Sequence, residues 1–226
     1  MSVSVNDSGT FREAQQIFVN DGGTWRSATK VQVNDNGIWR TVFPTLLNFS
    51  SATPGQQSVT VPAGVFSVTI GVYAAGGGGG SAMHTGDLFG GGGGGSGGYL
   101  TTQVVAVTPG QVLTVNVASG GAGGVYPGFQ AGGRNGAAGG TSSVVAGATT
   151  VSADGGGGGR FGTPGAGGTG GDPNGVNGAA GQSAAQGGAG GPGGNNGTGF
   201  GSGGNANREA SGSSGANGFV TIVNTP

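Results

Sequence analysis

Few residues in this chain could do chemistry, and its single histidine, His84, is the first to consider. A Ser-His-Asp triad would have to centre on this residue, because the imidazole is the general base of such a triad. Nothing around it, in SAMHTGDLF, resembles a nucleophile motif. GxGxxG matches occur, but a chain with 61 glycines in 226 residues produces them by chance, and no strand-glycine-helix unit follows them. The sequence therefore predicts a protein that is not an enzyme and has no cofactor.

Acidic residues recur as Asp7, Asp21 and Asp35, each in a copy of the same short motif. Their surroundings lack the ligand spacing of a dedicated calcium loop, so we interpret them as turn residues whose carboxylates accept nearby backbone N–H groups. The chain has no cysteine, which excludes both a disulfide framework and a thiolate zinc site. We expect no bound metal.

The charge balance narrows the class of partner. Seven Lys and Arg residues stand against eight Asp and Glu, so no electrostatic attraction to nucleic acid is expected. No apolar run approaches the roughly 18 residues of a membrane span, and MSVSVNDSG does not resemble a signal peptide. We expect a protein that is made in a cytoplasm and does not insert into membranes.

The N-terminal region contains a 14-residue repeat: VNDSGTFR at Val5, VNDGGTWR at Val19 and VNDNGIWR at Val33. Each copy predicts a β-hairpin, with a turn at the glycine and an aromatic residue opening the second strand. Alternation along a strand places the aromatic and the arginine on opposite faces. Because one hairpin alone is marginal in water, we expect the aromatics to meet in a shared core or to dock together on a partner. The proposed assembly residues are Phe11, Arg12, Trp25, Arg26, Trp39 and Arg40.

Three equivalent hairpins in residues 1–45 suggest a module that trimerises or caps a trimeric partner, since like symmetry lets equivalent surfaces be used three times. Residues 46–56 are expected to be a linker. From residue 57 the chain alternates apolar and polar residues, predicting strands around a turn at 62–64, around a second turn at 108–111, within 141–159 and over 218–224. We therefore expect an all-β fold: hairpin repeats, then an antiparallel β sandwich or barrel that merges into a glycine-rich bundle over residues 57–226.

Glycine is concentrated after residue 75, with 54 of the 61 glycines in residues 76–226. Within this part, glycines recur every third residue, as at Gly162, Gly165, Gly168 and Gly171. Three residues per turn is the period of the left-handed polyproline II helix, whose N–H and C=O groups all point outward. Without side chains, such helices can approach closely enough to hydrogen-bond to one another, forming a polyglycine II bundle. The alternative is a disordered tract.

Bulky side chains interrupt the glycine at five places, and a close-packed lattice has no room for them. Aromatic and arginine residues on loops held by a rigid scaffold are typical of binding surfaces. The alternative is that the aromatics plug the edges of the bundle. The candidate receptor-binding residues at these loop tips are Met83, His84, Asp87, Leu88, Phe89, Tyr126, Phe129, Gln130, Arg134, Arg160, Phe161, Asp172, Asn174, Arg208 and Glu209.

The runs VPAGVFSVTIGVYAAGGGGG, GGTSSVVAGATTVSADGGGGG and GANGFVTIVN together resemble the glycine-rich domain at the distal ends of bacteriophage tail fibres and related tail proteins. The VNDxGxWR copies are similar to short repeats of phage tail and structural proteins. The resemblance implies a virion adhesin in which loops between polyglycine II helices contact a bacterial surface receptor, either an outer-membrane protein or a glycan. It also implies other phage tail proteins as partners. The hairpin repeats and regular strands depart from the layout of those adhesins.

Two other functions remain open. A capsid or tail decoration protein could use the same repeats for docking without recognising a host. An ice-binding polyglycine II bundle also has glycine at every third residue, although the flat Thr-lined or apolar face that it needs is not evident in the sequence.

Overall fold

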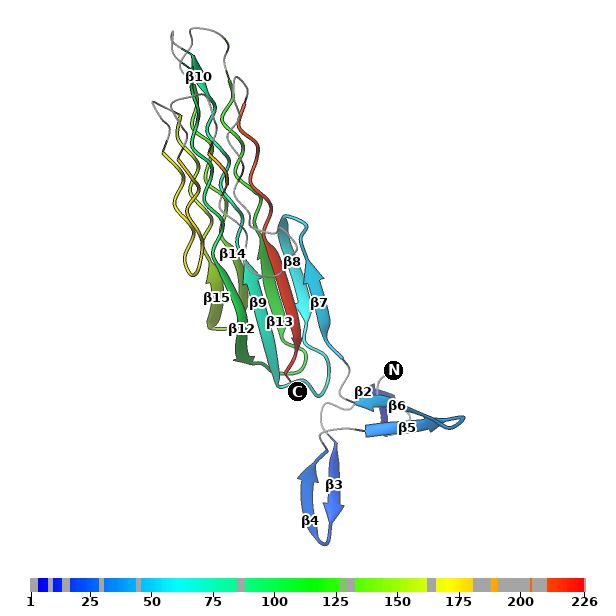
Figure 1. Ribbon diagram of the computed structural model, residues 1–226. Coiled ribbons are helices and arrows are strands. Elements are labelled where there is room, and N and C mark those ends of the chain that lie inside the picture. The colour runs from blue at the N-terminus through cyan, green and yellow to red at the C-terminus, as the bar shows by residue number, and fades with distance from the viewer. Residues whose placement is uncertain are drawn as a thin grey trace.

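The computed structural model describes residues 4–7, 10–13, 17–28, 31–43, 46–84, 88–126, 128, 133–161, 166–180, 188–190, 204 and 211–225. These residues form sixteen β-strands and no helix (Figure 1). The N-terminal strands are β1 (Ser4–Asp7), β2 (Thr10–Glu13), β3 (Phe18–Asp21), β4 (Thr24–Ser27), β5 (Val31–Asp35) and β6 (Ile38–Phe43). The remaining strands are β7 (Asn48–Ser51), β8 (Gly55–Thr60), β9 (Ser67–Tyr73), β10 (Met83–His84), β11 (Leu88–Phe89), β12 (Tyr99–Ala106), β13 (Val112–Val117), β14 (Ser142–Ala146), β15 (Thr149–Ala153) and β16 (Phe219–Asn224).

The N-terminal strands pair as three separate two-stranded antiparallel sheets, β1 with β2, β3 with β4, and β5 with β6. The register is the same in the second and third pairs: Asn20 lies opposite Trp25, and Asn34 lies opposite Trp39. Gly37, which follows Asn36 in the turn between β5 and β6, has φ of 85°, and Asn36 has φ of 51°. Positive φ at both central turn residues matches the right-handed twist of the flanking strands.

Asparagine side chains accept hydrogen bonds from the backbone in the second and third turns. The Oδ1 atom of Asn20 accepts a hydrogen bond from the Gly23 backbone N–H at 2.8 Å, and Asn34 accepts one from Gly37 at the same distance. Asp21 instead lies 3.8 Å from the Arg26 Nε atom, with both side chains exposed. The expected role of the aspartates is therefore corrected in the second repeat: the residue one position earlier is the acceptor.

The tryptophans of the repeats do not share a core. Trp25 is 67% exposed and Trp39 is 64% exposed. The side chains of Phe11, Arg12 and Arg40 lie outside the described part of the structure. Of the two expectations for the aromatics, a shared core is therefore wrong for Trp25 and Trp39, and docking on a partner stays a prediction.

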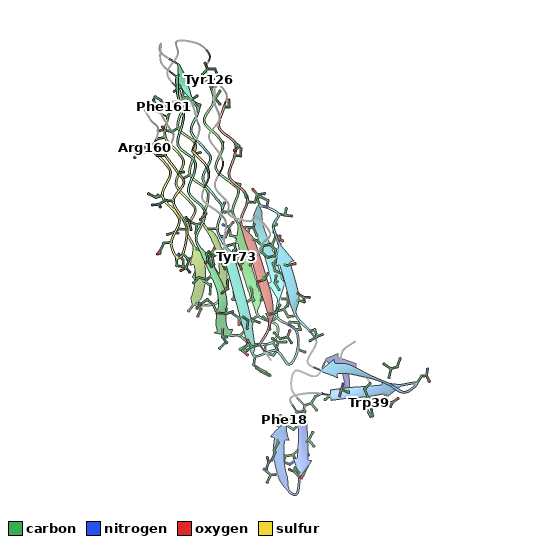
Figure 2. All side chains as sticks on the ribbon, in the orientation of Figure 1. Phe18, Trp39, Tyr73, Tyr126, Arg160 and Phe161 are labelled. Atoms are coloured by element: carbon green, nitrogen blue, oxygen red, sulfur yellow. The ribbon has the colours of Figure 1, made fainter. Side chains whose placement is uncertain are left out.

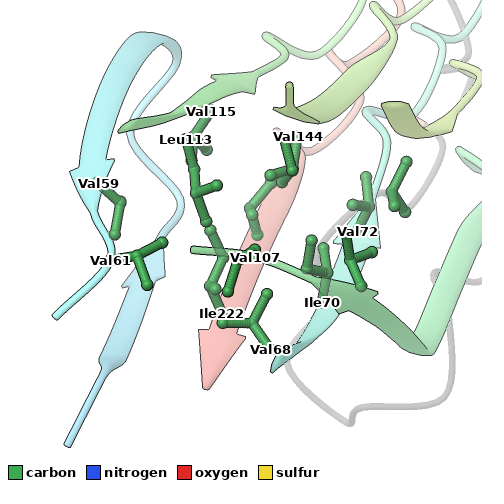
Figure 3. Packing of buried hydrophobic residues seen from close by; sticks show 14 of the residues in the cluster. Val59, Val61, Val68, Ile70, Val72, Val107, Leu113, Val115, Val144 and Ile222 are labelled. Atoms are coloured by element: carbon green, nitrogen blue, oxygen red, sulfur yellow. The ribbon is translucent and has the colours of Figure 1, made fainter. Parts of the chain in front are cut away.

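Two four-stranded antiparallel sheets form the body of the molecule, with strand orders β12-β9-β16-β7 and β15-β14-β13-β8. Neither closes into a barrel. Alternate residues of the strands point between the sheets and are buried, because one face of each strand is apolar. Figure 3 shows this core, in which Ile70 and Ile222 of one sheet face Leu113 and Val144 of the other; all four are fully buried.

Strand β7 differs from the sequence prediction. It lies within residues 46–56, which were expected to be a linker, yet it pairs with β16 along Asn48 to Ser51. Its burial pattern is only partial, so the apolar alternation that reveals the other strands is weak here.

Glycine-rich segments extend from one end of the sheets and return to it (Figure 1). Three run outward, residues 74–82 after β9, residues 118–126 after β13 and residues 154–161 after β15. Returning segments lead into β12, β14 and β16. We call this array the glycine bundle, its end at the sheets the base, and its other end the distal end.

The bundle is held together by backbone hydrogen bonds between segments, and the bonding pattern repeats every third residue. We call residues 74–82 the central outward segment. Its N–H groups donate to backbone carbonyls in the pairs Ala74 to Gly98, Ala75 to Gly140, Gly76 to Ala216, Gly77 to Gly95, Gly78 to Ala137 and Gly79 to Ser213, at 2.9 to 3.2 Å. Successive N–H groups thus point to three neighbours in rotation. Carbonyl groups of the same segment accept from three further segments, at Gly121, Gly156 and Gly204. Six neighbours therefore surround this segment.

Segments whose backbones hydrogen-bond directly to one another lie so close that glycine is required between them. Residues 74–82 and 90–98 are buried throughout. A β-carbon on Gly78 or Gly95 would fall within 3.0 Å of a neighbouring backbone carbonyl, a separation that real β-carbons essentially never show. Glycine is therefore required at the positions where neighbouring backbones touch.

Candidate functional site

The candidate site is the distal end of the glycine bundle, where outward segments carry aromatic and arginine residues. Figure 2 shows Tyr126, Arg160 and Phe161 at this end, far from Tyr73 at the base. Gly80 and Ser81, on the central outward segment, reach the same level. The sequence identified these aromatic and arginine residues because side chains of that size cannot lie inside a glycine lattice.

Ser81 fixes the segment that carries Arg134. Its hydroxyl accepts a hydrogen bond from the Arg134 backbone N–H at 2.7 Å, and the Ser81 N–H donates to the Arg134 carbonyl at 3.0 Å. Ser81 itself is completely buried. The backbone of Arg134 is therefore held rigidly while its side chain is exposed. Sequence reasoning missed Ser81, although a lone serine after five glycines is a usable signal.

Arg160 lies on a second segment that contacts residues 74–82. A β-carbon on Gly80 would approach the Arg160 carbonyl carbon to 2.6 Å, so the two backbones are in direct contact. The Arg160 N–H donates to Ala166 and its carbonyl accepts from Gly92, each at 2.8 Å. The Arg160 side chain is exposed. Both arginines thus project from hydrogen-bonded backbone.

The segments that carry the two arginines are also bonded directly to each other. The Phe161 N–H donates to Asn135 Oδ1 at 3.1 Å, and the Gly136 N–H donates to the Gly159 carbonyl at 2.8 Å. The Phe161 side chain begins against Gly133, where an added β-carbon would lie 3.1 Å from its own, and the residue is 38% exposed. We call Ser81, Arg134, Asn135, Arg160 and Phe161 the distal cluster. Asn135 is a second residue that sequence reasoning missed.

Tyr126 ends the outward segment that follows β13. Its N–H donates to the Ser211 hydroxyl at 3.0 Å, and its side chain is partly exposed. The preceding Val125 is 64% exposed. The distal end therefore presents an aliphatic and two aromatic side chains besides the arginines.

Other candidates on the neighbouring loop are described only in part. Met83 pairs with Phe89 and His84 pairs with Leu88 across strands β10 and β11. The side chains of these four residues lie outside the described part of the structure. Five further candidates lie wholly outside it: Asp87, Phe129, Gln130, Arg208 and Glu209.

Asp172 and Asn174 lie at the base, away from the distal cluster. The Asp154 N–H donates to the Asp172 carbonyl at 2.7 Å, and the Asn174 side-chain amide donates to the Tyr99 carbonyl at 3.0 Å. Asn174 has φ of 67°, a conformation that asparagine tolerates in turns. This loop reverses the chain beside β12, so its polar residues form a turn at the base rather than part of a tip.

An aromatic group marks the junction between the sheets and the bundle. The rings of Tyr73 and Tyr99 stack with centroids 5.8 Å apart, and Phe219 lies 6.1 Å from Tyr73. Burial, with a smaller contribution from the charge of Tyr99, raises the pKa of the Tyr73 phenol above its ordinary value. Three flat side chains thus cover the edge at which glycine packing begins.

Two other kinds of site are absent from the described residues. There is no cluster of three or more His, Cys, Asp or Glu side chains that could hold a metal ion. That part of the chain also has no helix with the length and apolar character of a membrane span.

The fold and the distal cluster define an all-β protein whose sheets support a glycine bundle with side chains gathered at the far end. The chain matches the glycine-rich domain family over residues 51–225 and belongs to that family. The match covers both four-stranded sheets, apart from most of β7, and the whole bundle. No curated protein matches the chain.

Proposed function

We propose that the protein is a virion protein of a bacteriophage tail fibre or tail tip, and that its distal end binds a bacterial surface receptor during host attachment. The observation that supports this most is the separation of roles along the bundle. The interior is backbone packed on backbone, whereas exposed Arg134, Arg160 and Phe161 lie on neighbouring segments at one end. Binding residues on a rigid scaffold lose little conformational entropy when a ligand binds.

We infer that the glycine segments are polyglycine II helices. The rotation of hydrogen-bond donors among three neighbours, repeating every third residue, is what a helix with three residues per turn requires. Such a bundle is stiff because each bonded segment is tied to several others along its length. Its stiffness would let the distal cluster keep its shape at the end of a fibre.

The N-terminal repeats are proposed to attach the protein to its fibre, either as a homotrimer or as a cap on a trimeric partner. Isolated two-stranded sheets are marginal in water, and here the tryptophans of two such pairs are exposed. Burial of these rings against other phage tail proteins would supply the missing stabilisation. The central segments of the bundle, by contrast, form their hydrogen bonds within one chain.

Adsorption of the labelled full chain to a panel of bacteria tests the proposal. We expect saturable binding to some strains, which protease treatment of the cells removes if the receptor is a protein and periodate removes if it is a glycan. Failure to bind any strain, together with stoichiometric incorporation into virions, would contradict host recognition and favour the decoration protein. The exposed tryptophans are compatible with that alternative, so the adsorption result decides between them.

A further inference from the structure

Charged side chains are segregated along the glycine bundle. Residues 76–226 contain only seven of them. Of those that the structure describes, Asp154 and Asp172 lie at the base, whereas Arg134 and Arg160 lie at the distal end. Asp154 and Arg160 belong to one extended segment, and at about 3.1 Å per residue they are roughly 19 Å apart. The base is therefore acidic and the distal end basic within the described residues.

The backbones of the two arginines are held close to each other. Arg134 is bonded to Ser81 and Arg160 contacts Gly80, and the residues that follow the arginines are joined by the hydrogen bond from the Phe161 N–H to Asn135. Within the described part of the chain no acidic side chain forms an ion pair with either guanidinium. Two exposed arginine side chains therefore start from adjacent segments that are hydrogen-bonded to each other. We call Arg134 and Arg160 the arginine pair.

We propose that the arginine pair binds an anionic substituent, a phosphate or carboxylate, on a bacterial surface glycan. The proposal rests on the proposed function and specifies its receptor. Guanidinium groups bind phosphate and carboxylate oxygens in a bidentate geometry, and such charge-assisted bonds are about twice as strong as neutral ones. Phe161 stands directly beside Arg160, where its ring can lie against the apolar C–H face of a sugar. A glycan with acidic substituents offers both contacts.

The size of the site favours a glycan over a protein receptor. A stable protein interface buries about 800 Å² on each partner and has an apolar centre. Among the described residues, the distal cluster offers two arginines, one asparagine amide and one partly exposed ring, a largely polar set that suits a small charged group on a chain of sugars. Specificity in such a site comes from a few directed polar contacts rather than from area.

The test uses three immobilised polymers with one backbone: dextran, dextran phosphate and carboxymethyl dextran. Binding of the full chain is measured by a surface biosensor at two salt concentrations. We expect at least tenfold tighter binding to one or both anionic polymers than to dextran, and weaker binding at higher salt because exposed charges are screened. The stronger of the two anionic polymers identifies the group that the site prefers.

Variants locate the binding. The double variant R134Q/R160Q should bind the preferred polymer at least tenfold more weakly, and each single variant should show part of that loss. The control is K30Q, which removes one positive charge at a residue that is given no role in binding or assembly. It should bind as the parent does. The side chains of Arg134 and Arg160 are exposed, so the melting temperature of R134Q/R160Q is expected to stay unchanged.

Equal binding to dextran and its anionic derivatives would overturn the proposal. So would unchanged binding by R134Q/R160Q, or an equal loss in K30Q, because either result would show that the affinity does not come from the arginine pair. Adsorption of R134Q/R160Q to bacteria separates this failure from that of the proposed function. Undiminished adsorption by the double variant would refute the arginine pair as the site but not the proposed host recognition. Binding of the parent to anionic dextran through the pair, without adsorption to any bacterium, would support the site and refute the proposed function.

Discussion

The backbones of Gly77 and Gly157 are in such close contact that a β-carbon on Gly77 would overlap the Gly157 carbonyl group. The same carbonyl accepts a hydrogen bond from Gly95 at 2.8 Å, and Gly95 in turn accepts one from Gly77 at 2.9 Å. Three segments therefore meet at one point with no space for a methyl group. Every prediction about the bundle follows from contacts of this kind.

Replacement of Gly77 by alanine should destabilise the protein strongly. Neighbouring backbones must separate to admit the methyl group, and overpacking of this kind costs about 1–3 kcal/mol of unfolding free energy, or more where backbone must move. For a chain of this size, each kcal/mol lowers the melting temperature by roughly 2–4 °C. The control is Ala138→Ser, which adds one atom to an exposed position on a neighbouring segment. Equal melting temperatures for G77A and the control would be incompatible with the packing described here.

Ser96 should be required for its hydroxyl. It is 1% exposed, and its Oγ atom accepts a hydrogen bond from the Val176 N–H at 2.8 Å. The Ser96→Ala change leaves that N–H without its partner, at a cost of about 1–3 kcal/mol. Ser152→Ala, at an exposed position of β15, should cost less than about 0.5 kcal/mol. Urea unfolding monitored by tyrosine fluorescence measures both, and similar midpoints for the two variants would show that the buried hydroxyl contributes nothing.

Alkaline pH should destabilise the protein through Tyr73. Its pKa is raised in the folded state above the ordinary value of 10.0, mainly by burial. The folded state therefore retains the phenolic proton longer than the unfolded state. Stability from this group is fully present below about pH 10 and is lost as the pH rises through the folded pKa. Tyrosine titrates in roughly the range from pH 9 to pH 12. Across this range the unfolding free energy of Tyr73→Phe should fall less steeply with pH than that of the parent protein. A profile as steep as that of the parent would place the titrating group elsewhere.

Removal of the exposed tryptophans should affect assembly and not folding. Trp25 and Trp39 bury little surface within the chain, so W25S/W39S should melt within about 1 °C of the parent. Incorporation into virions should fall sharply, because the rings are proposed to be buried against tail proteins. Complementation of a phage lacking the gene, with quantification of the protein in purified particles, measures this. Normal incorporation would remove the attachment role of these residues.

The strands and the glycine packing could be predicted because their patterns are local. Alternation marks β13 and β16, and the three-residue glycine period marks the segments of the bundle. In both cases a side chain's size decides its position directly: valine fills the core, and glycine alone fits between neighbouring backbones.

Other features depended on contacts between distant residues. Asp172 and Asn174 interrupt the glycine much as Arg160 does, but nothing local indicates that their loop turns at the base beside Tyr99. Strand β7 is recognisable through its pairing with β16, about 170 residues later in the chain. The choice of Asn20 over Asp21 as turn acceptor depended on the register of β3 and β4, which shifts the turn by one residue.

Amide hydrogen exchange in residues 74–82 and 90–98 of the full chain tests the central claim most directly. These residues are buried, and the N–H groups of residues 74–81, 92–96 and 98 are bonded between segments, so we predict that these groups exchange as slowly as those of the core strands β9 and β16. Exchange at the rate of an unstructured glycine peptide, while β9 and β16 remain protected, would contradict the account, because the bundle would then offer no fixed support for Arg134 and Arg160.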